Sequence, residues 1–232
     1  MPLWILPIAA FLAGSIPFGL FIAKAKGVNI REHGSGNIGA TNVLRVIGKP
    51  YGIACLLLDF LKGFVPTVTA VSLCLIEGKT PQTAIESLRE LATTFPAADA
   101  WQAQTIIIIT GLFTILGHNY SPWIGFKGGK GIATSGGVLI ALMPVGVLIL
   151  ILIWIVLFYT TRYVSIASIG AAASVPFVTI YGSYKHGYIA DGTWNKPLFV
   201  FSIVIGALAI WKHRSNIKNL MNGSEHKFSK KK

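Results

Sequence analysis

Long runs of apolar residues dominate the pattern of polar and apolar positions along the chain. Examples are Ile106–Leu116, Val138–Tyr159 and Pro197–Trp211. A run of about 20 apolar residues crosses the hydrocarbon core of a bilayer as a helix. A membrane β-barrel instead requires segments of about ten residues in which apolar and polar positions alternate, and these runs do not alternate. The pattern therefore predicts an all-α integral membrane protein.

The apolar segments predict a seven-helix transmembrane bundle that forms one domain over residues 1–232. Pro144 divides one long run in two, because proline removes a backbone donor and clashes with the preceding helical turn. The arm before it is short for a full crossing at about 1.5 Å per residue, so a re-entrant segment stays open. The predicted helices are Leu3–Ala23, Tyr51–Ile76, Trp101–Gly117, Ile132–Met143, Val145–Tyr159, Val164–Tyr181 and Pro197–Trp211. The polar tail is expected to be ordered near Asn216–Leu220 and frayed at 230–232.

Charged residues make up only 12% of the 232 residues, about half the share found in soluble domains. Lys and Arg number 20 against 8 Asp and Glu, which gives a formal net charge of +12. The basic residues collect in segments 24–49, 127–130 and 212–232, whereas Glu77–Asp99 is acidic. Because cytoplasmic loops of membrane proteins are rich in Lys and Arg, the N-terminus is expected outside and the C-terminus in the cytoplasm. This distribution follows topology and argues against binding of nucleic acid.

The acidic segment and the two cysteines carry little predicted chemistry. In segment 77–100, Thr80 can cap a short helix that has Pro81 at its first position, and such a helix would lie on the membrane surface. Cys55 and Cys74 fall within one predicted span. Neither a disulfide nor a metal site is therefore expected from them.

The first polar loop, Gly34–Arg45, combines glycines with short polar side chains. It matches G-x-G-x-x-G, but a dinucleotide site requires a preceding strand, and here both flanks are predicted membrane helices. Its glycines can expose backbone N–H groups as an anion-binding nest, and Arg45 carries a guanidinium fork suited to phosphate. The alternative is an ordinary turn, since Gly, Ser and Asn are common turn residues. For this loop alone, both interpretations stay open.

The second polar loop, His118–Gly131, ends in Lys127-Gly128-Gly129-Lys130 and leads into a predicted helix. It does not satisfy the Walker A spacing, yet it places glycines and two lysines before hydroxyls at a helix N-terminus, where an anion is favoured. The alternative is that the lysines only anchor the topology. Anchoring does not require the adjacent glycines, so phosphate binding is the favoured interpretation.

Three further groups of polar residues stand out. His213 lies in the basic segment 212–220 and can be a general base, a hydrogen-bonding site residue or a surface histidine in a tail attracted to anionic lipid. Asp59 and Lys62 lie three residues apart and face the same side of a predicted span. Because charges within a membrane are normally paired or line a polar cavity, a structural ion pair is favoured over a role beside a site. Ser165 can face the same polar region.

Taken together, the polar segments resemble one family. Ser35–Asn42 with Arg45, then Phe126–Gly131 with Thr134, then His213–Ile217 occur in this order. The chain resembles the bacterial acyl-phosphate-dependent glycerol-3-phosphate acyltransferases over almost its whole length. This resemblance implies a multi-pass enzyme of the bacterial inner membrane with its active site on the cytoplasmic face. The implied reaction transfers a fatty acyl group from acyl phosphate to the sn-1 hydroxyl of glycerol 3-phosphate, giving lysophosphatidic acid and inorganic phosphate.

The resemblance also implies which residues form the site. The expected catalytic residues are Ser35, Arg45, Lys130, His213 and Asn216. The expected substrate-binding residues are Gly36, Asn37, Gly39, Thr41, Asn42, Lys127, Gly128, Gly129, Gly131, Thr134 and Ser165. Those expected as a structural ion pair or at the border of the site are Asp59, Lys62 and Glu225. No cofactor, metal or obligate protein partner is implied, and the partners are the two substrates and membrane lipid.

Two competing functions are less favoured. His186 and Asp191 match the H-x-x-x-x-D spacing of a different acyltransferase class, but they lie on a predicted external loop away from the basic loops. A transporter of phosphorylated solutes would use a similar basic cavity. Transporters often show inverted repeats and interrupted helices at the membrane midplane, and the sequence shows no internal repeat.

Overall fold

A computed structural model describes residues 2–228 of the chain. The predicted frayed tail at 230–232 lies outside the described residues. The chain divides into two compact units, Met1–Leu142 and Met143–Lys232, referred to below as unit 1 and unit 2. The single transmembrane domain over residues 1–232 stays a prediction.

Unit 1 contains six α-helices and two short strands within its described residues. Its elements are α1 (Ile5–Gly14), α2 (Phe18–Ala25), η1 (Ile30–Glu32), α3 (Ala40–Val46), α4 (Lys49–Leu73), β1 (Cys74–Ile76), η2 (Glu86–Leu91), β2 (Thr93–Phe95), η3 (Ala97–Asp99), α5 (Ala100–Asn119), η4 (Pro122–Ile124) and α6 (Ile132–Leu142). Unit 2 consists of α7 (Pro144–Thr161), α8 (Val164–Lys185), α9 (Lys196–Lys212) and α10 (Arg214–Met221). The predicted all-helical character is confirmed.

Five helical segments within residues 2–228 are long and apolar enough to cross a membrane. They are Ile5–Ala25, Lys49–Leu73, Ala97–Ile124, Pro144–Thr161 and Val164–Lys185. A sixth results if α9 and α10, which meet at a bend of 53°, are counted as one span. The short apolar helix α6 is the remaining predicted crossing. The count of seven transmembrane helices and the orientation of the termini stay predictions.

Prolines mark two breaks, of which one was predicted. As expected, α6 ends at Leu142 and α7 begins at Pro144, which occupies the first turn of the new helix. The first predicted span, by contrast, is broken between Gly14 and Phe18. There, Pro17 lacks a backbone donor, and the carbonyls of the interrupted turn are reached by side chains from other elements.

The segment after α4 departs most from the prediction. No helix begins at Thr80, and Glu86–Leu91 forms a short 3-10 helix instead. The strands β1 and β2 form a parallel pair in the register Cys74↔Thr93 and Ile76↔Phe95, so Cys74 lies in a strand rather than in the span. Strand pairing satisfies backbone groups that a short isolated helix would leave open at its ends.

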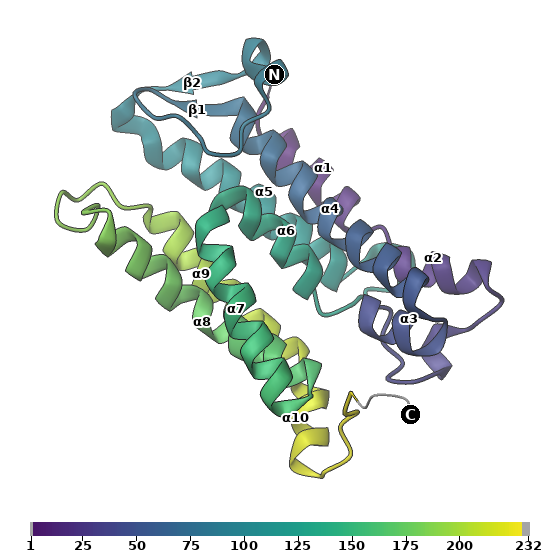
Figure 1. The fold of residues 1–232 in the computed structure, drawn as a ribbon. Coiled ribbons are helices and arrows are strands. Elements are labelled where there is room, and N and C mark those ends of the chain that lie inside the picture. The colour runs from purple at the N-terminus through teal and green to yellow at the C-terminus, as the bar shows by residue number, and fades with distance from the viewer. Residues whose placement is uncertain (1, 229–232) are drawn as a thin grey trace. The chain divides into compact units, whose positions relative to one another are not determined.

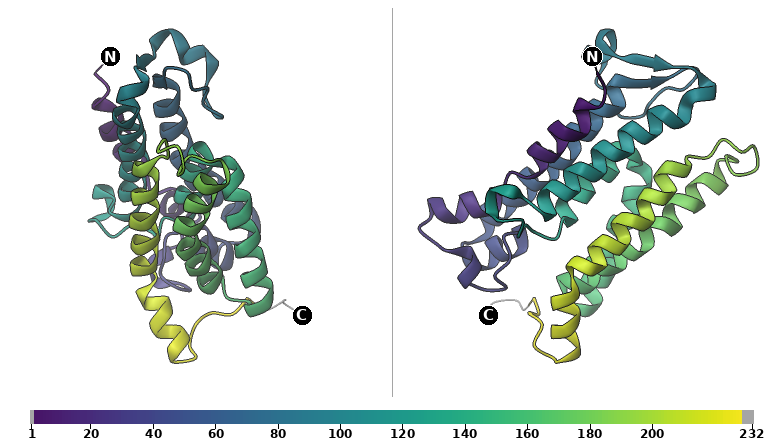
Figure 2. Two further views of the ribbon diagram at one scale, coloured as in Figure 1. Left: turned by 90° about the vertical axis from the view of Figure 1, so that its left-hand side faces the viewer. Right: turned by 180° about the vertical axis from the view of Figure 1, so that it is seen from behind.

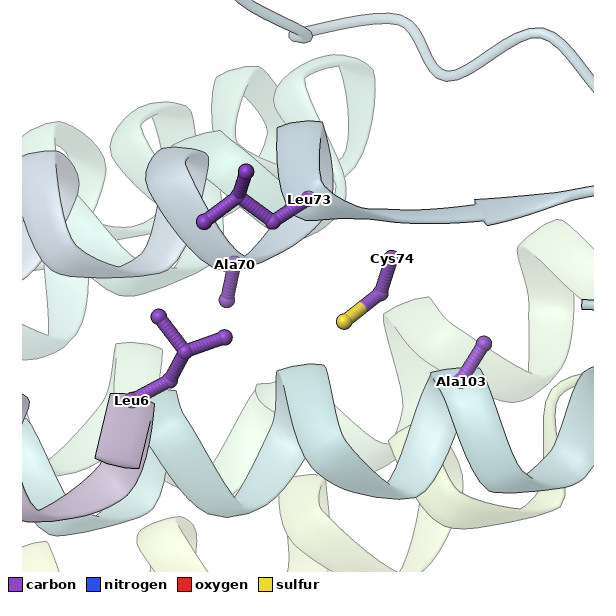
Figure 3. Packing of buried hydrophobic residues seen from close by; sticks show 5 residues of the cluster. All are labelled: Leu6, Ala70, Leu73, Cys74 and Ala103. Atoms are coloured by element: carbon purple, nitrogen blue, oxygen red, sulfur yellow. The ribbon is translucent and has the colours of Figure 1, made fainter. Parts of the chain in front are cut away.

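Apolar packing holds this segment against the helices of unit 1. Figure 3 shows a buried cluster of residues from α1, α4, β1 and α5, against which the segment packs. Leu88 and Phe95 of the segment pack against this cluster. The residues of the cluster are Leu6, Ala70, Leu73, Cys74 and Ala103. Leu88 and Phe95 thus face the helices, whereas Leu91 is 67% exposed.

Glycines let pairs of helices in unit 1 approach closely. A Cβ atom at Gly63 of α4 would lie 2.1 Å from the carbonyl oxygen of Thr134 in α6, and one at Gly137 of α6 would lie 2.0 Å from that of Phe60. Small residues at helix contacts are the usual means of close packing in membranes. This contact fixes α6 against α4, so the N-terminal half of α6 is held beside Phe60 and Gly63 of α4.

The two ends of unit 1 differ in composition. In Figure 1, the helices α2 and α3 lie at one end, and β1 and β2 lie with the N-terminus at the other. The first end carries the basic loops and the second carries the acidic segment 77–99. We refer to them as the basic end and the acidic end of unit 1. In unit 2, α10 and the loop between α8 and α9 lie at opposite ends (Figure 2).

Candidate active site

Asn42 organises the first loop from its centre. This residue is buried in α3, and its side-chain oxygen accepts a hydrogen bond of 2.9 Å from the backbone N–H of Ser35. Its side-chain nitrogen lies 2.9 Å from the carbonyl oxygen of Asn37 and 3.0 Å from that of His33. The amide therefore holds the backbone of its own loop, and the expected contact of Asn42 with substrate stays a prediction.

Two further features give the first loop its turn. Gly34 and Gly36 adopt positive φ angles of 61° and 67°, a region that glycine enters without steric cost. The side-chain oxygen of Asn37 accepts a hydrogen bond of 2.8 Å from the backbone N–H of Gly39. Of the predicted site residues here, Ser35 and Arg45 are exposed and Thr41 is half-buried. The loop thus presents its hydroxyl and guanidinium groups outward on a hydrogen-bonded frame.

The second loop folds back onto the end of α5. The backbone N–H groups of Gly128 and Gly129 donate to the carbonyl oxygens of Asn119 and His118, at 3.2 and 3.1 Å. A Cβ atom at Gly128 would lie 2.0 Å from the His118 carbonyl oxygen, and one at Gly129 would lie 2.2 Å from the His118 Nε2 atom. Packing alone therefore requires glycine at both positions, whether or not the loop binds an anion.

The fold brings the two loops together. The guanidinium of Arg31 donates a hydrogen bond of 2.8 Å to the carbonyl oxygen of Lys127. Ile124 of the second loop packs against a buried cluster that includes Ile38 and Val43 of the first loop. Both loops therefore lie at the basic end of unit 1, as the sequence predicted for its basic segments.

The second loop leads directly into α6. Lys127 is exposed and Lys130 is half-buried just before the helix begins at Ile132. Thr134 in its first turn is fully buried, and its hydroxyl has no hydrogen-bond partner among the described residues. Because unpaired N–H groups at a helix N-terminus favour an anion, the lysines and this terminus together suit a phosphate group.

The predicted ion pair between Asp59 and Lys62 is confirmed at 2.8 Å, and both side chains are buried. The same carboxylate lies 3.6 Å from the Nδ1 atom of His118. Sequence reasoning missed His118 as part of this group. The available signal was a histidine at the end of an apolar span, where a buried titratable group requires a polar neighbour.

Unit 2 holds a smaller polar group around α10. His213 is buried where α9 meets α10, and its Nδ1 atom lies 2.7 Å from the carbonyl oxygen of Ala209. The side-chain nitrogen of Asn216 donates a hydrogen bond of 2.7 Å to the carboxylate of Glu225. The two predicted residues Asn216 and Glu225 are thus direct partners, which the sequence did not show.

Ser165 and the described end of the chain lie at the turn between α7 and α8. Ser165 is buried, and its hydroxyl has no hydrogen-bond partner among residues 2–228. The backbone N–H of Phe228 donates a hydrogen bond of 2.9 Å to the carbonyl oxygen of Arg162, and its ring packs on that of Phe158 at 5.7 Å. The segment after α10 is thereby fastened to this turn within unit 2.

The alternative pair His186 and Asp191 lies elsewhere in unit 2. Both residues are exposed on the loop between α8 and α9, at the opposite end of the unit from α10 (Figure 2). The carboxylate of Asp191 accepts hydrogen bonds from the backbone and the hydroxyl of Thr193. His186 stacks on Tyr188. Within the described residues, no group of three His, Cys, Asp or Glu side chains is placed to hold a metal ion.

These features define the class of protein. Apolar helices long enough to cross a bilayer carry two glycine-rich basic loops and buried polar groups near their ends, as in an integral membrane protein. The family model for glycerol-3-phosphate acyltransferase matches residues 4–223. The chain therefore belongs to the glycerol-3-phosphate acyltransferase family.

Individual relatives agree with this assignment. A glycerol-3-phosphate acyltransferase of Aquifex aeolicus is 43% identical over 223 residues, which cover 96% of this chain and 97% of the relative. One of Fusobacterium nucleatum is 39% identical over 222 residues, covering 95% of each chain. A crystal structure of PlsY, an integral membrane glycerol 3-phosphate acyltransferase in its glycerol 3-phosphate form, is 41% identical. It matches with a TM-score of 0.77 over 99% of this chain and 96% of that one. The lysophosphatidic acid form is 40% identical, with a TM-score of 0.72 over the same shares of the two chains.

Proposed function

We propose that this protein transfers a fatty acyl group from acyl phosphate to the sn-1 hydroxyl of glycerol 3-phosphate. The products are lysophosphatidic acid and inorganic phosphate, and the reaction is the first acylation in phospholipid synthesis. Membership of the family and the order of the three polar segments support this proposal. The resemblance to PlsY, solved with glycerol 3-phosphate and in a lysophosphatidic acid form, supports it further.

The observation that carries the proposal is the contact between the two glycine-rich loops. Arg31, just before the first loop, donates to the backbone of Lys127, and Ile124 of the second loop packs on the cluster that includes Ile38 and Val43 of the first. Both substrates of the proposed reaction carry phosphate, so the enzyme needs two anion sites near each other. Two glycine-rich loops with the cationic side chains of Arg45, Lys127 and Lys130 supply them.

Two groups of residues divide the substrates between them in this proposal. In the first loop, Ser35, Asn37, Thr41 and the backbone around Gly36 and Gly39 contact the head group of acyl phosphate. Arg45 and Lys130 contact the phosphate of glycerol 3-phosphate, and Lys127, Gly128, Gly129, Gly131 and Thr134 complete that site. In unit 2, His213, Asn216 and Ser165 are assigned to the same reaction by their match to the third motif and the family pattern, and Glu225 by its bond to Asn216.

The chemistry asks for positioning more than for a strong catalytic base. The sn-1 oxygen of glycerol 3-phosphate attacks the carbonyl carbon of acyl phosphate, and the bond from that carbon to the phosphate oxygen breaks. The hydroxyl proton passes to phosphate, which leaves as inorganic phosphate. Because acyl phosphate is already an activated mixed anhydride, aligned substrates and stabilised developing charge supply most of the rate.

We assign His213 to substrate binding and the proton transfer to a substrate phosphate. His213 has its Nδ1 atom held at 2.7 Å by the Ala209 carbonyl oxygen, an arrangement that suits a fixed hydrogen-bonding group. His213→Ala is expected to raise the KM for glycerol 3-phosphate and to leave kcat within about tenfold. A fall in kcat of about 10²–10⁴-fold with unchanged KM would instead assign general-base catalysis to His213.

We further propose that the enzyme is a multi-pass protein of the bacterial inner membrane with this site on the cytoplasmic face. The basic and acidic segments of unit 1 lie at opposite ends of its helices (Figure 1). Lys and Arg concentrate on the cytoplasmic side of membrane proteins. Labelling of cysteines introduced at Lys79 and Lys127 in intact and opened cells tests this orientation. Labelling of Lys127→Cys in intact cells would contradict it.

The experiment that tests the donor uses purified protein with glycerol 3-phosphate. Palmitoyl phosphate, palmitoyl-CoA and palmitoyl carrier protein are supplied separately, and lysophosphatidic acid is measured. Product is expected from palmitoyl phosphate alone, with one phosphate released for each acyl group transferred. Product from either thioester but not from acyl phosphate would overturn the proposal.

A further inference from the structure

We propose that Asp59, Lys62 and His118 form a buried positioning device that holds the second loop in place for its anion. The inference rests on the proposed function, because it concerns the loop to which that function assigns the phosphate of glycerol 3-phosphate. It assigns a role to three side chains beneath the loop that the proposed chemistry itself does not use.

The device begins at the break in the first span. Because α1 ends before Pro17, the carbonyl groups of Ser15 and Ile16 lose their partners in the helix. The ammonium group of Lys62 donates a hydrogen bond of 2.8 Å to the Ile16 carbonyl oxygen. The hydroxyl of Ser121 donates one of 2.6 Å to the Ser15 carbonyl oxygen. Both donors tie the break to α4 and to the second loop.

Asp59 connects Lys62 with His118. Its carboxylate lies 2.8 Å from the Lys62 ammonium and 3.6 Å from the His118 Nδ1 atom. All three residues are less than 8% exposed. A buried charge that loses its partner is strongly destabilising, so each of these groups restrains the position of the next.

His118 in turn supports the glycines of the second loop. Its carbonyl oxygen accepts the backbone N–H of Gly129, and its ring fills the space where a Cβ atom at Gly129 would lie. The imidazole therefore has Asp59 on one side and the loop backbone on the other. A shift of the ring displaces the N–H groups of Gly128 and Gly129, and with them the lysine that follows.

A matched control pair lies at the acidic end of the same unit. Glu86 and Arg89 share the spacing of three residues, and their side chains form an ion pair of 2.9 Å. These side chains are 80% and 70% exposed, whereas those of Asp59 and Lys62 are each 4% exposed. Exposed pairs of this kind contribute little, so neutralising them controls for the loss of charge alone.

The test compares Asp59→Asn/Lys62→Gln with Glu86→Gln/Arg89→Gln in the full chain. The first double variant removes both buried charges together and keeps amide groups that can hydrogen-bond. It is therefore expected to fold, whereas a single substitution would leave one buried charge without its partner. Two quantities are measured: the steady-state constants for glycerol 3-phosphate, and the rates of tryptic cleavage after Lys127 and after Lys26. We expect the buried variant to raise KM about tenfold with kcat within about threefold.

Proteolysis reports on the loop without any assumption about activity. In the buried variant, cleavage after Lys127 is expected to accelerate about fivefold or more while cleavage after Lys26 stays unchanged, as expected for local opening. The control variant should match the wild type in all measurements. Equal acceleration at both sites would show general loosening and overturn the inference, as would an unchanged KM with unchanged cleavage.

A third variant separates this inference from the proposed function. Lys130→Met removes the proposed phosphate contact and leaves the three buried residues in place. If the loop responds to the buried variant but Lys130→Met keeps wild-type kinetics, positioning stands and the proposed phosphate contact falls. If Lys130→Met loses activity while the rate of cleavage after Lys127 is the same in the buried double variant as in the wild type, the proposed function stands and the positioning inference falls.

Discussion

The two ends of unit 1 are joined by the same long helices but are held together by different interactions. At the basic end, side chains bind backbone groups far away in the sequence: Arg31 reaches the second loop across 96 residues, and Ser121 reaches the break in the first span across 106. At the acidic end, two short strands pair through their backbones, and the ion pair of Glu86 and Arg89 lies on the surface with both side chains largely exposed.

The conformation of the basic end therefore depends on individual side chains, whereas that of the acidic end depends mainly on backbone hydrogen bonds. At the basic end, the position of the anion-binding groups follows from a few buried amides, charges and glycines. At the acidic end, side-chain hydrogen bonds that involve Ser72, Thr83 and Gln102 link the described part of the segment to α4, α6 and α5. Similar substitutions are therefore expected to change catalysis at the basic end and only the stability of the protein at the acidic end.

The largest contrast is expected between two lysines. Lys130→Met removes the ammonium group before α6, and kcat/KM for glycerol 3-phosphate should fall about 10²-fold, because hydrogen bonds from a charged group contribute about 1.5–3 kcal/mol. Lys79→Met removes an exposed lysine at the acidic end and should leave the kinetics unchanged. Steady-state assays with palmitoyl phosphate measure both. Equal losses in the two variants would refute the comparison.

A second contrast uses two glycines. Gly128→Ala places a Cβ atom 2.0 Å from the His118 carbonyl oxygen, which forces the second loop to move, and a displacement of about 1 Å can reduce the rate up to about 10²-fold. A fall of about 30-fold in kcat/KM is expected on this basis. At Gly78, a Cβ atom meets nothing within 4 Å. Gly78→Ala should cost about 1 kcal/mol, because the φ angle is positive, with normal kinetics.

The smallest contrast uses two buried hydrogen-bonding side chains. Asn42→Ala removes the amide that holds the first loop, and kcat/KM should fall about tenfold along with a loss of stability of about 2 kcal/mol. Ser72 is buried in α4 and accepts a hydrogen bond of 2.8 Å from the backbone of Ile85. Ser72→Ala should cost about 1 kcal/mol of stability and leave kcat/KM unchanged. Thermal unfolding and kinetics on the same samples distinguish the two outcomes.

The elements predicted correctly from sequence were those with a local signal. The break at Pro144 and the ion pair between Asp59 and Lys62 each depend on residues at most four positions apart, so spacing alone was sufficient. The break before Pro17 was missed, although the proline is visible. It is stabilised by Lys62 and Ser121, whose proximity follows only from the packing of three helices.

The missed features share this non-local origin. Strands of three residues are too short to show alternation, and β1 pairs with β2 only because the intervening segment returns along the helices. The carboxylate beside His118 comes from α4, and no motif joins the two residues. The amide of Asn42 bonds the backbone of its own loop, which the motif does not show, and its expected contact with substrate stays a prediction.

Direct binding of glycerol 3-phosphate tests the central claim that the basic end of unit 1 holds this substrate. Calorimetric titration of the purified protein in lipid nanodiscs, without acyl donor, measures the affinity of the wild type, Lys130→Met and Lys79→Met. The account predicts saturable binding to the wild type and to Lys79→Met, and affinity at least about tenfold lower for Lys130→Met. Equal affinity in all three proteins would contradict it.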